Sequence, residues 1–439
     1  MRPGRTIAAV VLLAALPSAC GGSAGSGHHH KPRGPARPVA ASICGPVTYG
    51  GKGRPEVVIV NSGPLQGPQS DHGIQNAQAV KMVLAQRGWR AGKLTVGVQV
   101  CDEASASSPL PSPAKCARNA KAFAADPSVV AVVGPVSSTC SAAMLPILNR
   151  SPDGAVPVIS MSNTYLGLTR AGPGVAKGHP DAFYPTGQHN FVRMAPADDL
   201  QGAASALYAQ RLGVRRPYVL HHDEAWGVGV ATAFRTAATR LGMDVAGMDR
   251  WGRRARDYTR LAHRIRRAGA DAVYVGGYAV ADNGPRLVKD LRATLGPDVP
   301  ILAPDGFNEP AALVEGAGTA AEGVVITLAA MPTSKLPPAG LRFARQFQQR
   351  FGALPCCYSV YTAQATNTAL DAIARSDGSR AGMLRNLFGT RVRGGLLGDF
   401  AIDRHGDTTL TDIAVYRVHG ARVRLATVIR PSTDLLDRR

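Results

Sequence analysis

The sequence predicts an α/β protein built from two doubly wound, Rossmann-like lobes. Short and almost wholly apolar segments alternate with amphipathic helical segments along most of the 439 residues. Continuous apolarity is typical of parallel strands that are covered on both faces, and the β-α-β-α-β order occurs twice. With 45% hydrophobic and 18% charged residues, the composition excludes a polytopic membrane protein and a wholly disordered chain.

Eight apolar segments are the predicted strands, and seven amphipathic segments are the helices that cover them. The strands are expected at 57–60, 94–100, 129–133, 156–160, 218–221, 272–275, 301–303 and 323–328. The helices are expected at 72–87, 116–125, 141–149, 200–212, 227–241, 258–268 and 285–294. Two further helices at 339–351 and 361–374 precede a predicted hairpin, 412–418 and 422–428, around Gly420.

The segment 258–268 shows how the periodicity is interpreted. Tyr258, Ala262 and Ile265 fall on one helical stripe, whereas the arginines fall off it. Eight arginines and one acid lie between Arg250 and Arg267, and this basic run is expected to be the solvated face of a packed helix. A partner surface is the alternative.

The formal charge of +20 raises the question of a nucleic-acid partner. Nine lysines and 41 arginines make up the 50 basic residues, and this bias, with abundant Ala and Gly, is typical of a GC-rich genome. Aromatic residues are only 5%, and no zinc-finger or RNP pattern occurs. We therefore expect no nucleic-acid partner.

The first residues have the order of a secretory signal. Arg2 and Arg5 precede an apolar run at 7–16, which is too short to span a bilayer, and small residues then lead to Cys20. The segment resembles a bacterial lipobox, with Pro17 where an aliphatic residue is usual. The prediction is a signal peptide at 1–19, a lipidated Cys20 and a flexible tether through 20–54, which together place the protein on the outer face of the cell membrane. The alternative is an ordinary signal peptide with an incidental cysteine.

Six cysteines remain after Cys20, and an even number in an exported chain favours disulfides. No C-x-x-C motif indicates a zinc ribbon or a thioredoxin-like site. The adjacent Cys356 and Cys357 are expected to pair elsewhere, with Cys44 or Cys101 as candidate partners.

A series of short motifs resembles type I periplasmic binding proteins, and within them the leucine/isoleucine/valine-binding family. The motifs occur in the family's order over about residues 55–420. They are VVIVN at 57–61 with GPLQGP at 63–68, VVAVVG at 129–134 with SST at 137–139, VPVIS at 156–160 with NT at 163–164, DD at 198–199 with QG at 201–202, DAV at 271–273 with GGY at 276–278, PDG at 304–306, AEGV at 321–324, and GDF at 398–400 with GD at 406–407.

The resemblance implies two lobes joined by three crossovers, near 191–193, 325–328 and 393–397. Lobe 1 would comprise 55–192 plus 327–394, and lobe 2 would comprise 193–326 plus 395–430. A small ligand would lie in the cleft, and the lobes would close on it by a hinge motion.

The resemblance also implies a set of ligand-binding residues. Hydroxyls and backbone N–H groups at a helix N-terminus suit a ligand carboxylate, and a carboxylate suits a ligand ammonium. The carboxylate site would use Ser138, Thr139, Ser162, Asn163 and Thr164, the ammonium site Asp305, and the aromatic walls His72, Trp226 and Tyr278. The alternatives are that the hydroxyls cap helices, Asp305 stabilises a turn, and the aromatic residues belong to the core.

Cys116 and Cys140 open the two helices that flank the strand at 129–133. The family commonly joins these elements, so the resemblance implies a Cys116–Cys140 disulfide that braces the carboxylate-binding turn.

The predicted function is that of a lipid-anchored solute-binding protein. It would deliver an amino acid or a similar small polar ligand to an ABC permease and its ATPase, with no cofactor, no metal and no catalysis. A sensor of the same fold is the alternative. An exported enzyme is disfavoured because the chain has no Gly-x-Ser-x-Gly, His-Glu-x-x-His or Walker A motif, and adjacent residues on the strand ending at 221–224 cannot converge on a metal.

Overall fold

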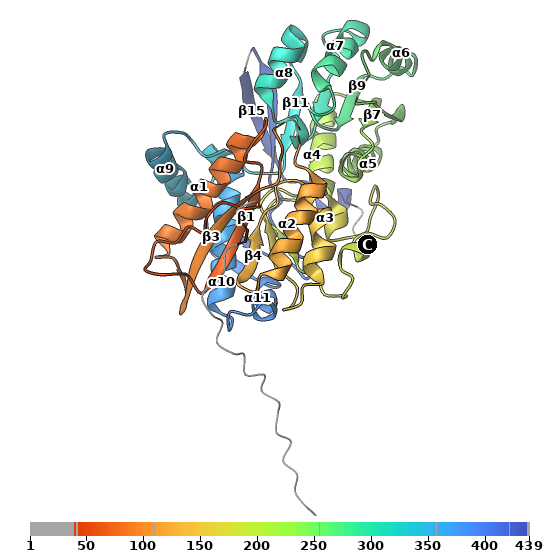
Figure 1. The fold of residues 1–439 in the computed structure, drawn as a ribbon. Coiled ribbons are helices and arrows are strands. Elements are labelled where there is room, and N and C mark those ends of the chain that lie inside the picture. Colours follow the sequence, from red (N-terminus) through yellow and green to blue (C-terminus); the bar gives the residue numbers. More distant parts are fainter. Residues whose placement is uncertain are drawn as a thin grey trace, which may run out of the picture. The chain divides into compact units, whose positions relative to one another are not determined.

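The structure is a computed structural model (Figure 1), and it describes residues 39–40, 43–106, 108, 110–253, 255–356, 358–420 and 422–436. The predicted signal peptide, Cys20, the first part of the predicted tether and Cys357 lie outside the described residues. Among the described helices, none combines the length and the apolarity needed to cross a membrane.

The first sheet has six strands in the order β2-β3-β1-β4-β5-β6. All neighbouring pairs are parallel except β2 with β3. The strands are β1 (Val57–Gly63), β2 (Arg90–Ala91), β3 (Leu94–Asp102), β4 (Val129–Val133), β5 (Val158–Ser160) and β6 (Phe191–Arg193).

Helices cover both faces of this sheet, as expected for strands with no polar face. Alternate residues of β1 show the two faces: Ile59 belongs to the core formed with α1 (Ser70–Gln86) and α10 (Ser359–Ala374). Val60 belongs to the core formed with α2 (Pro113–Ala125) and α3 (Ser138–Asn149).

The second sheet has seven strands in the order β15-β14-β11-β10-β9-β7-β8, and its neighbouring pairs are parallel except the two that contain β14. Its strands are β7 (Pro217–His221), β8 (Gly247–Arg250), β9 (Ala272–Gly276), β10 (Ile301–Ala303), β11 (Val325–Leu328), β14 (Ile413–His419) and β15 (Arg422–Ile429). The predicted C-terminal hairpin is thus confirmed as β14–β15. One face is covered by α4 (Asp198–Arg211) and α5 (Ala225–Arg240), and the other by α6 (Thr259–Arg267), α7 (Gly284–Leu295) and α8 (Pro310–Ala317).

The chain passes between the two sheets three times, which confirms the predicted two-lobed fold. It leaves the first sheet after β6 and returns after β11, because α9 (Pro338–Phe351), α10 and α11 (Arg380–Leu387) pack with the first sheet. Figure 1 shows these late, blue helices beside the early, orange elements. A hairpin of β12 (Arg391–Gly395) and β13 (Gly398–Ala401) precedes the last passage to β14.

All three predicted lobe boundaries fall inside elements of the fold, and the first, at 192–193, lies within β6. The boundary at 326–327 lies within β11, and the boundary at 394–395 lies within the β12–β13 hairpin. In that hairpin, Phe400 joins the core of the first sheet.

The sequence patterns missed the shortest and most polar elements. The strand β8 gives no apolar pattern because it ends in Met-Asp-Arg, and polar residues of this kind are tolerated in an edge strand. The strand β6 was expected only as a crossover, yet it pairs with β5 before the chain leaves the sheet. Six short 3-10 helices also had no signal: Leu166–Leu168, Asp181–Phe183, Asp305–Phe307, Gly318–Ala321, Thr333–Lys335 and Thr433–Leu435.

The helix α6 confirms the interpretation of the basic run for its own arginines only. The arginines at 250–256 precede the helix, and Arg253 is held in ion pairs with Glu224 and Asp282. Ala262 and Ile265 of this helix are fully buried on its inner face. Arg264 faces outward and lies 2.7 Å from a carboxylate oxygen of Asp249. The arginines there are the exposed face of a packed helix.

One cysteine prediction was wrong. Cys44 pairs with Cys101 in a disulfide, so neither is available to Cys356, which is a free thiol. The cause is that the chain near Cys44 runs antiparallel along β3, where the Gly45 amide donates to the Val100 carbonyl over 2.9 Å. This part of the stretch assigned to the tether therefore belongs to the folded body.

Candidate functional site

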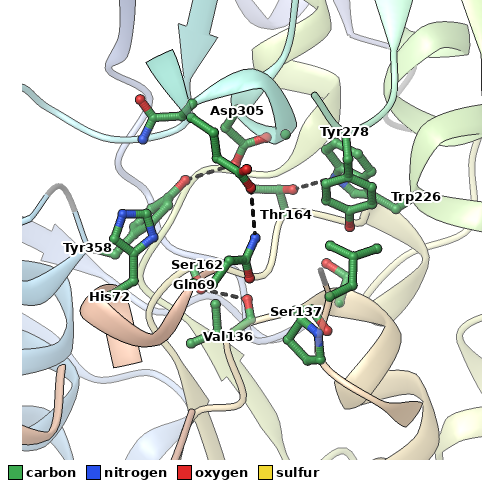
Figure 2. Close-up of a pocket in the computed structure, with 16 residues that line it drawn as sticks. Gln69, His72, Val136, Ser137, Ser162, Thr164, Trp226, Tyr278, Asp305 and Tyr358 are labelled. Carbon is green, nitrogen blue, oxygen red and sulfur yellow. Dashed lines mark hydrogen bonds between the residues drawn. The ribbon is translucent and has the colours of Figure 1, made fainter. Parts of the chain in front are cut away.

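A cavity of about 100 Å³ lies between the two lobes, at the carboxyl ends of β4, β5, β9 and β10 (Figure 2). Parallel strands of doubly wound sheets present their ligand-binding loops at this end. Seven of the nine predicted site residues line the cavity: His72, Ser138, Ser162, Thr164, Trp226, Tyr278 and Asp305.

The first lobe contributes hydroxyls at the start of α3. Ser137 is the N-cap, and its Oγ accepts a hydrogen bond from the Cys140 amide over 3.1 Å. The Ser138 Oγ accepts from the Tyr165 amide over 3.2 Å, so its own hydrogen can be donated into the cavity. The first amides of a helix have no intrahelical acceptor and carry a partial positive charge. This wall therefore suits an anionic group.

Two predicted residues do not line this cavity. Asn163 is fully buried, and its amide nitrogen donates to the Pro135 and Val136 carbonyls over 3.0 and 2.7 Å. It thus holds the loop that carries the serines. The Thr139 side chain faces a neighbouring cavity, where its Oγ1 lies 3.4 Å from Glu224 Oε2.

Asp305 supplies the carboxylate of the second lobe. It begins the 3-10 helix that follows β10, and its Oδ2 accepts a hydrogen bond from the Tyr358 hydroxyl over 3.0 Å. Its other oxygen, Oδ1, is buried and has no hydrogen-bond partner among the described residues. Burial raises the pKa of Asp305 to about 6, against an ordinary value of 3.8, although interactions with Tyr358, Gln201 and the backbone amides of residues 305 and 306 limit the rise. The carboxylate is therefore poised to accept a positively charged donor.

Aromatic side chains form the remaining walls. Trp226 and Tyr278 stack with their ring centroids 4.6 Å apart, and Trp226 Nε1 donates to Thr164 Oγ1 over 3.0 Å across the lobes. Glycine is needed at position 306, because a Cβ there would lie 2.6 Å from the Trp226 ring and 2.4 Å from the Gly277 carbonyl oxygen. Burial lowers the pKa of His72, so this ring is neutral near pH 7.

The predicted set lacks five polar residues of the cavity, namely Gln69, Ser137, Asn308, Glu309 and Tyr358. Tyr358 lies 53 positions from Asp305, and Gln69 lies 240 positions from Glu309. No local pattern indicates such pairings. The position of Glu309 four residues after Asp305, on the same loop, is the one signal that could have pointed to it.

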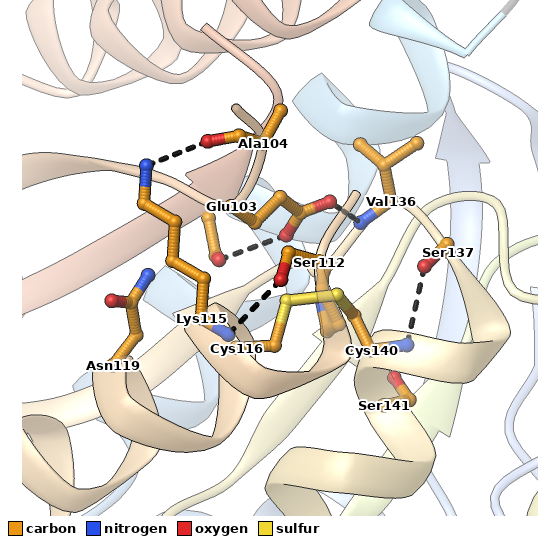
Figure 3. Close-up of a disulfide and its surroundings, with 12 residues drawn as sticks. Glu103, Ala104, Ser112, Lys115, Cys116, Asn119, Val136, Ser137, Cys140 and Ser141 are labelled. Carbon is orange, nitrogen blue, oxygen red and sulfur yellow. Dashed lines mark hydrogen bonds between the residues drawn. A yellow bond between two sulfur atoms is a disulfide. The ribbon is translucent and has the colours of Figure 1, made fainter. Parts of the chain in front are cut away.

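The predicted Cys116–Cys140 disulfide is present and joins α2 to α3 beside the serine loop (Figure 3). The fully buried Glu103 lies next to it and accepts hydrogen bonds from the Val136 amide and the Ser62 hydroxyl, each over 3.0 Å. Burial raises the pKa of Glu103 to about 7. The disulfide and the Glu103 carboxylate thus both hold the loop that carries the serines.

Replacing Cys116 and Cys140 together by serine is expected to lower the free energy of unfolding by about 3 kcal/mol, from the entropy of the closed loop. Urea unfolding measures this change. A variant of the free thiol, Cys356→Ser, is the control and should change stability far less. An unaltered urea midpoint in the double variant would show that the disulfide contributes nothing.

No metal centre forms among the described residues around these groups. Glu103, Cys116 and Cys140 are close enough together to hold an ion, but the two sulfurs are bonded to each other. In the segment 221–224, His222 lies 2.8 Å from Asp282, and Glu224 lies 2.5 Å from Arg253. Arg253 also lies 2.7 Å from Asp282, so these side chains form one network around an arginine, which leaves no room there for a metal ion.

Comparisons with known proteins agree with this architecture. The sequence matches the periplasmic binding protein family over residues 56–422. It is 25% identical over 371 residues to a leucine-, isoleucine-, valine-, threonine- and alanine-binding protein of Pseudomonas aeruginosa, covering 83% of this chain and 90% of that protein. An amino acid binding protein of the same organism is 24% identical over 370 residues, covering 82% and 90%.

Solved structures give the same result for the fold. A leucine-binding protein from Thermotoga maritima superposes with a TM-score of 0.70 at 25% identity, over 85% of this chain and 99% of that one. A branched-chain amino acid binding protein from Streptococcus pneumoniae, in complex with isoleucine, gives 0.69 at 19% identity over the same shares. This family consists of solute-binding proteins and is not enzymatic. The chain therefore belongs to the periplasmic binding protein family.

Proposed function

We propose that this chain is the extracytoplasmic substrate-binding lipoprotein of an ABC transporter, and that it captures an amino acid between its two lobes. The observation that carries the proposal is the pairing of opposite chemistries across one cavity. The start of α3 offers hydroxyl and amide donors, and Asp305 offers a buried carboxylate oxygen with no partner among the described residues. An amino acid zwitterion has the two groups that match them.

Proteins of similar fold that bind other ligands help to decide between an amino acid and an aromatic acid as the ligand. A Rhodopseudomonas palustris solute-binding protein, similar in fold with a TM-score of 0.66 at 15% identity, was solved with benzoate. An aromatic acid has a carboxylate for α3 but no cation for Asp305. Burying Asp305 against such a ligand would leave its charge uncompensated, which is costly. The cavity thus favours an amine-bearing ligand.

The roles assigned to the individual residues belong to the same proposal. The serine wall, with Ser138 and Ser162, would bind the ligand carboxylate, and Thr164 would donate its hydroxyl. Trp226, Tyr278 and His72 would form the walls around the ligand side chain. Asn163 and Thr139 would act from outside the cavity, the first by holding the serine loop and the second by touching Glu224 across the lobes.

Closure would occur about the three passages between the lobes, with lobe 1 as 55–192 plus 327–394 and lobe 2 as 193–326 plus 395–430. Three hydrogen bonds already connect opposite walls of the cavity, from Tyr358 to Asp305, from Trp226 to Thr164 and from Gln69 to Glu309. A ligand would compete with these bonds and then replace them.

The test is a thermal-shift titration of the purified protein with the twenty amino acids, and with benzoate as the acid that lacks an amine. Amino acids are expected to raise the melting temperature in a concentration-dependent way, and benzoate is not. Stabilisation by benzoate alone would contradict the proposal.

Membrane anchoring through Cys20 is tested separately. In cells, the full chain is expected in the membrane fraction, and the Cys20→Ala variant is expected in the soluble or secreted fraction, because a diacylglycerol anchor needs the thiol. Cys356→Ala serves as the control and should stay with the membrane. Equal distribution of the wild type and Cys20→Ala would remove the anchor from the proposal.

A further inference from the structure

A second carboxylate, Glu309, lines the cavity on the same loop as Asp305. Glu309 is the N-cap residue of α8, yet its side chain makes no capping hydrogen bond. Its Oε1 instead accepts a hydrogen bond from Gln69 Nε2 of the opposite lobe over 3.2 Å. The side chain therefore turns away from its own helix and spans the cavity.

The charge of the cavity is unbalanced. Among the described residues that line it, Asp305 and Glu309 are acids and none is Lys or Arg. His72 is the remaining titratable base of the lining, and burial keeps it neutral by lowering its pKa. Arg253 lies in the neighbouring cavity and is already paired with Glu224 at 2.5 Å and Asp282 at 2.7 Å. Neither cavity carboxylate therefore has a cationic partner within the lining.

Burying a carboxylate against a neutral donor alone is costly, and the environment of Glu309 reflects this. Burial raises the pKa of Glu309, and the hydrogen bond from Gln69 only partly offsets it. Asp305 shows the same imbalance, with one buried oxygen that lacks a partner among the described residues. Two uncompensated carboxylates in one cavity favour a ligand that brings two positive groups.

The positions of the two acids distinguish their partners. Under the proposed function, Asp305 takes the α-ammonium and the start of α3 takes the carboxylate. Glu309 faces Gln69, at the edge of the cavity formed by the beginning of α1. It is thus free to accept from the far end of a side chain.

We propose that the ligand is an amino acid whose side chain ends in a cationic nitrogen, and that Glu309 binds this nitrogen. The proposal rests on the proposed function and names its substrate class. An ammonium or guanidinium would replace the Gln69 amide with a charge-assisted donor, which binds a carboxylate about twice as strongly. Glu309 is then the residue that separates this ligand class from branched-chain amino acids.

The test compares L-lysine, L-ornithine and L-arginine with L-leucine by calorimetry on three proteins. These are the wild type, Glu309→Gln, and Glu315→Gln as a matched control, because Glu315 lies on the exposed face of the same helix α8. The glutamine variant keeps the size of the side chain and can still bond to Gln69, so folding should be retained. Thermal melting of each protein without ligand verifies this.

The wild type is expected to bind at least one cationic amino acid at least tenfold more tightly than leucine. Glu309→Gln should weaken that ligand by about tenfold to a hundredfold and leave leucine unchanged. Glu315→Gln should behave as the wild type. Putrescine, which lacks a carboxylate, should bind more weakly than ornithine.

Tight binding of leucine with none of lysine, ornithine or arginine would overturn this inference and leave the proposed function intact. Equal affinities of the wild type and Glu309→Gln for the cationic ligand would also overturn it. If putrescine bound as tightly as ornithine, the ligand would not need a carboxylate, and the claim that it is an amino acid would be overturned. If no amino acid binds the wild type, the proposed function fails, and the inference fails with it.

Discussion

The Asp305→Asn variant is expected to bind any amine-bearing ligand about a hundredfold more weakly than the wild type. Asparagine keeps the shape and can still accept a hydrogen bond from the Tyr358 hydroxyl, which lies 3.0 Å from Oδ2. It removes the negative charge that would face the ligand ammonium, and loss of one partner of a buried charge pair has effects of this size. Isothermal titration calorimetry at pH 7.5 measures the change.

The same carboxyl predicts the pH dependence of binding. Burial raises its pKa to about 6, so the group is mostly ionised at pH 7.5 and about nine-tenths protonated at pH 5. Affinity for an amine is therefore expected to fall about tenfold between these pH values. Without ligand the sign is opposite, because a carboxyl with a raised pKa destabilises the fold as pH rises from about 4 to 6.

Asp298→Asn is the control for both measurements, because Asp298 is an exposed residue just before β10. It should leave affinity and its pH profile unchanged. If Asp305→Asn bound as tightly as the wild type, or kept the same fall in affinity toward pH 5, Asp305 would not be the ammonium partner.

The Arg193→Met variant is expected to lose about 3 to 5 kcal/mol of folding free energy. Arg193 is completely buried, and its Nε lies 2.8 Å from Asp407 Oδ1. Burial alone would raise the pKa of Asp407, but the charges of Arg193 and Arg170 outweigh it and hold this pKa below its usual range. Removing Arg193 leaves a buried carboxylate with less compensation.

The Arg193→Met substitution should also affect the ligand site. Arg193 donates to the Asn163 and Tyr165 carbonyls over 3.1 and 3.0 Å, so it fixes the backbone on both sides of Thr164. Weaker ligand binding is expected together with the lower stability.

Urea unfolding of Arg193→Met is best compared with Arg87→Met. Arg87 forms a 2.6 Å ion pair with Asp371, but both side chains are more than 40% exposed. Such a surface pair contributes about 0 to 1 kcal/mol. Equal losses in the two variants would contradict the assigned importance of the buried pair.

The sequence by itself determined the main strands of the two sheets and the loops that carry the site. Apolar segments such as Val129–Val133 fold as strands at the predicted residues because their burial on both faces leaves few alternatives. The resemblance of the motifs to the leucine/isoleucine/valine-binding family implied one cleft for Ser138, Thr164 and Asp305, and the loops after β4, β5 and β10 carry these residues to one cavity.

Only the tertiary structure decided which residues meet across the cleft. Tyr358 reaches Asp305, and Gln69 reaches Glu309, because helices from distant parts of the chain are brought against the second lobe. The pairing of Cys44 with Cys101 likewise depends on a segment that adds itself to the edge of β3. Periodicity reports how a segment buries its own apolar face, and it carries no information about polar partners that packing brings from elsewhere.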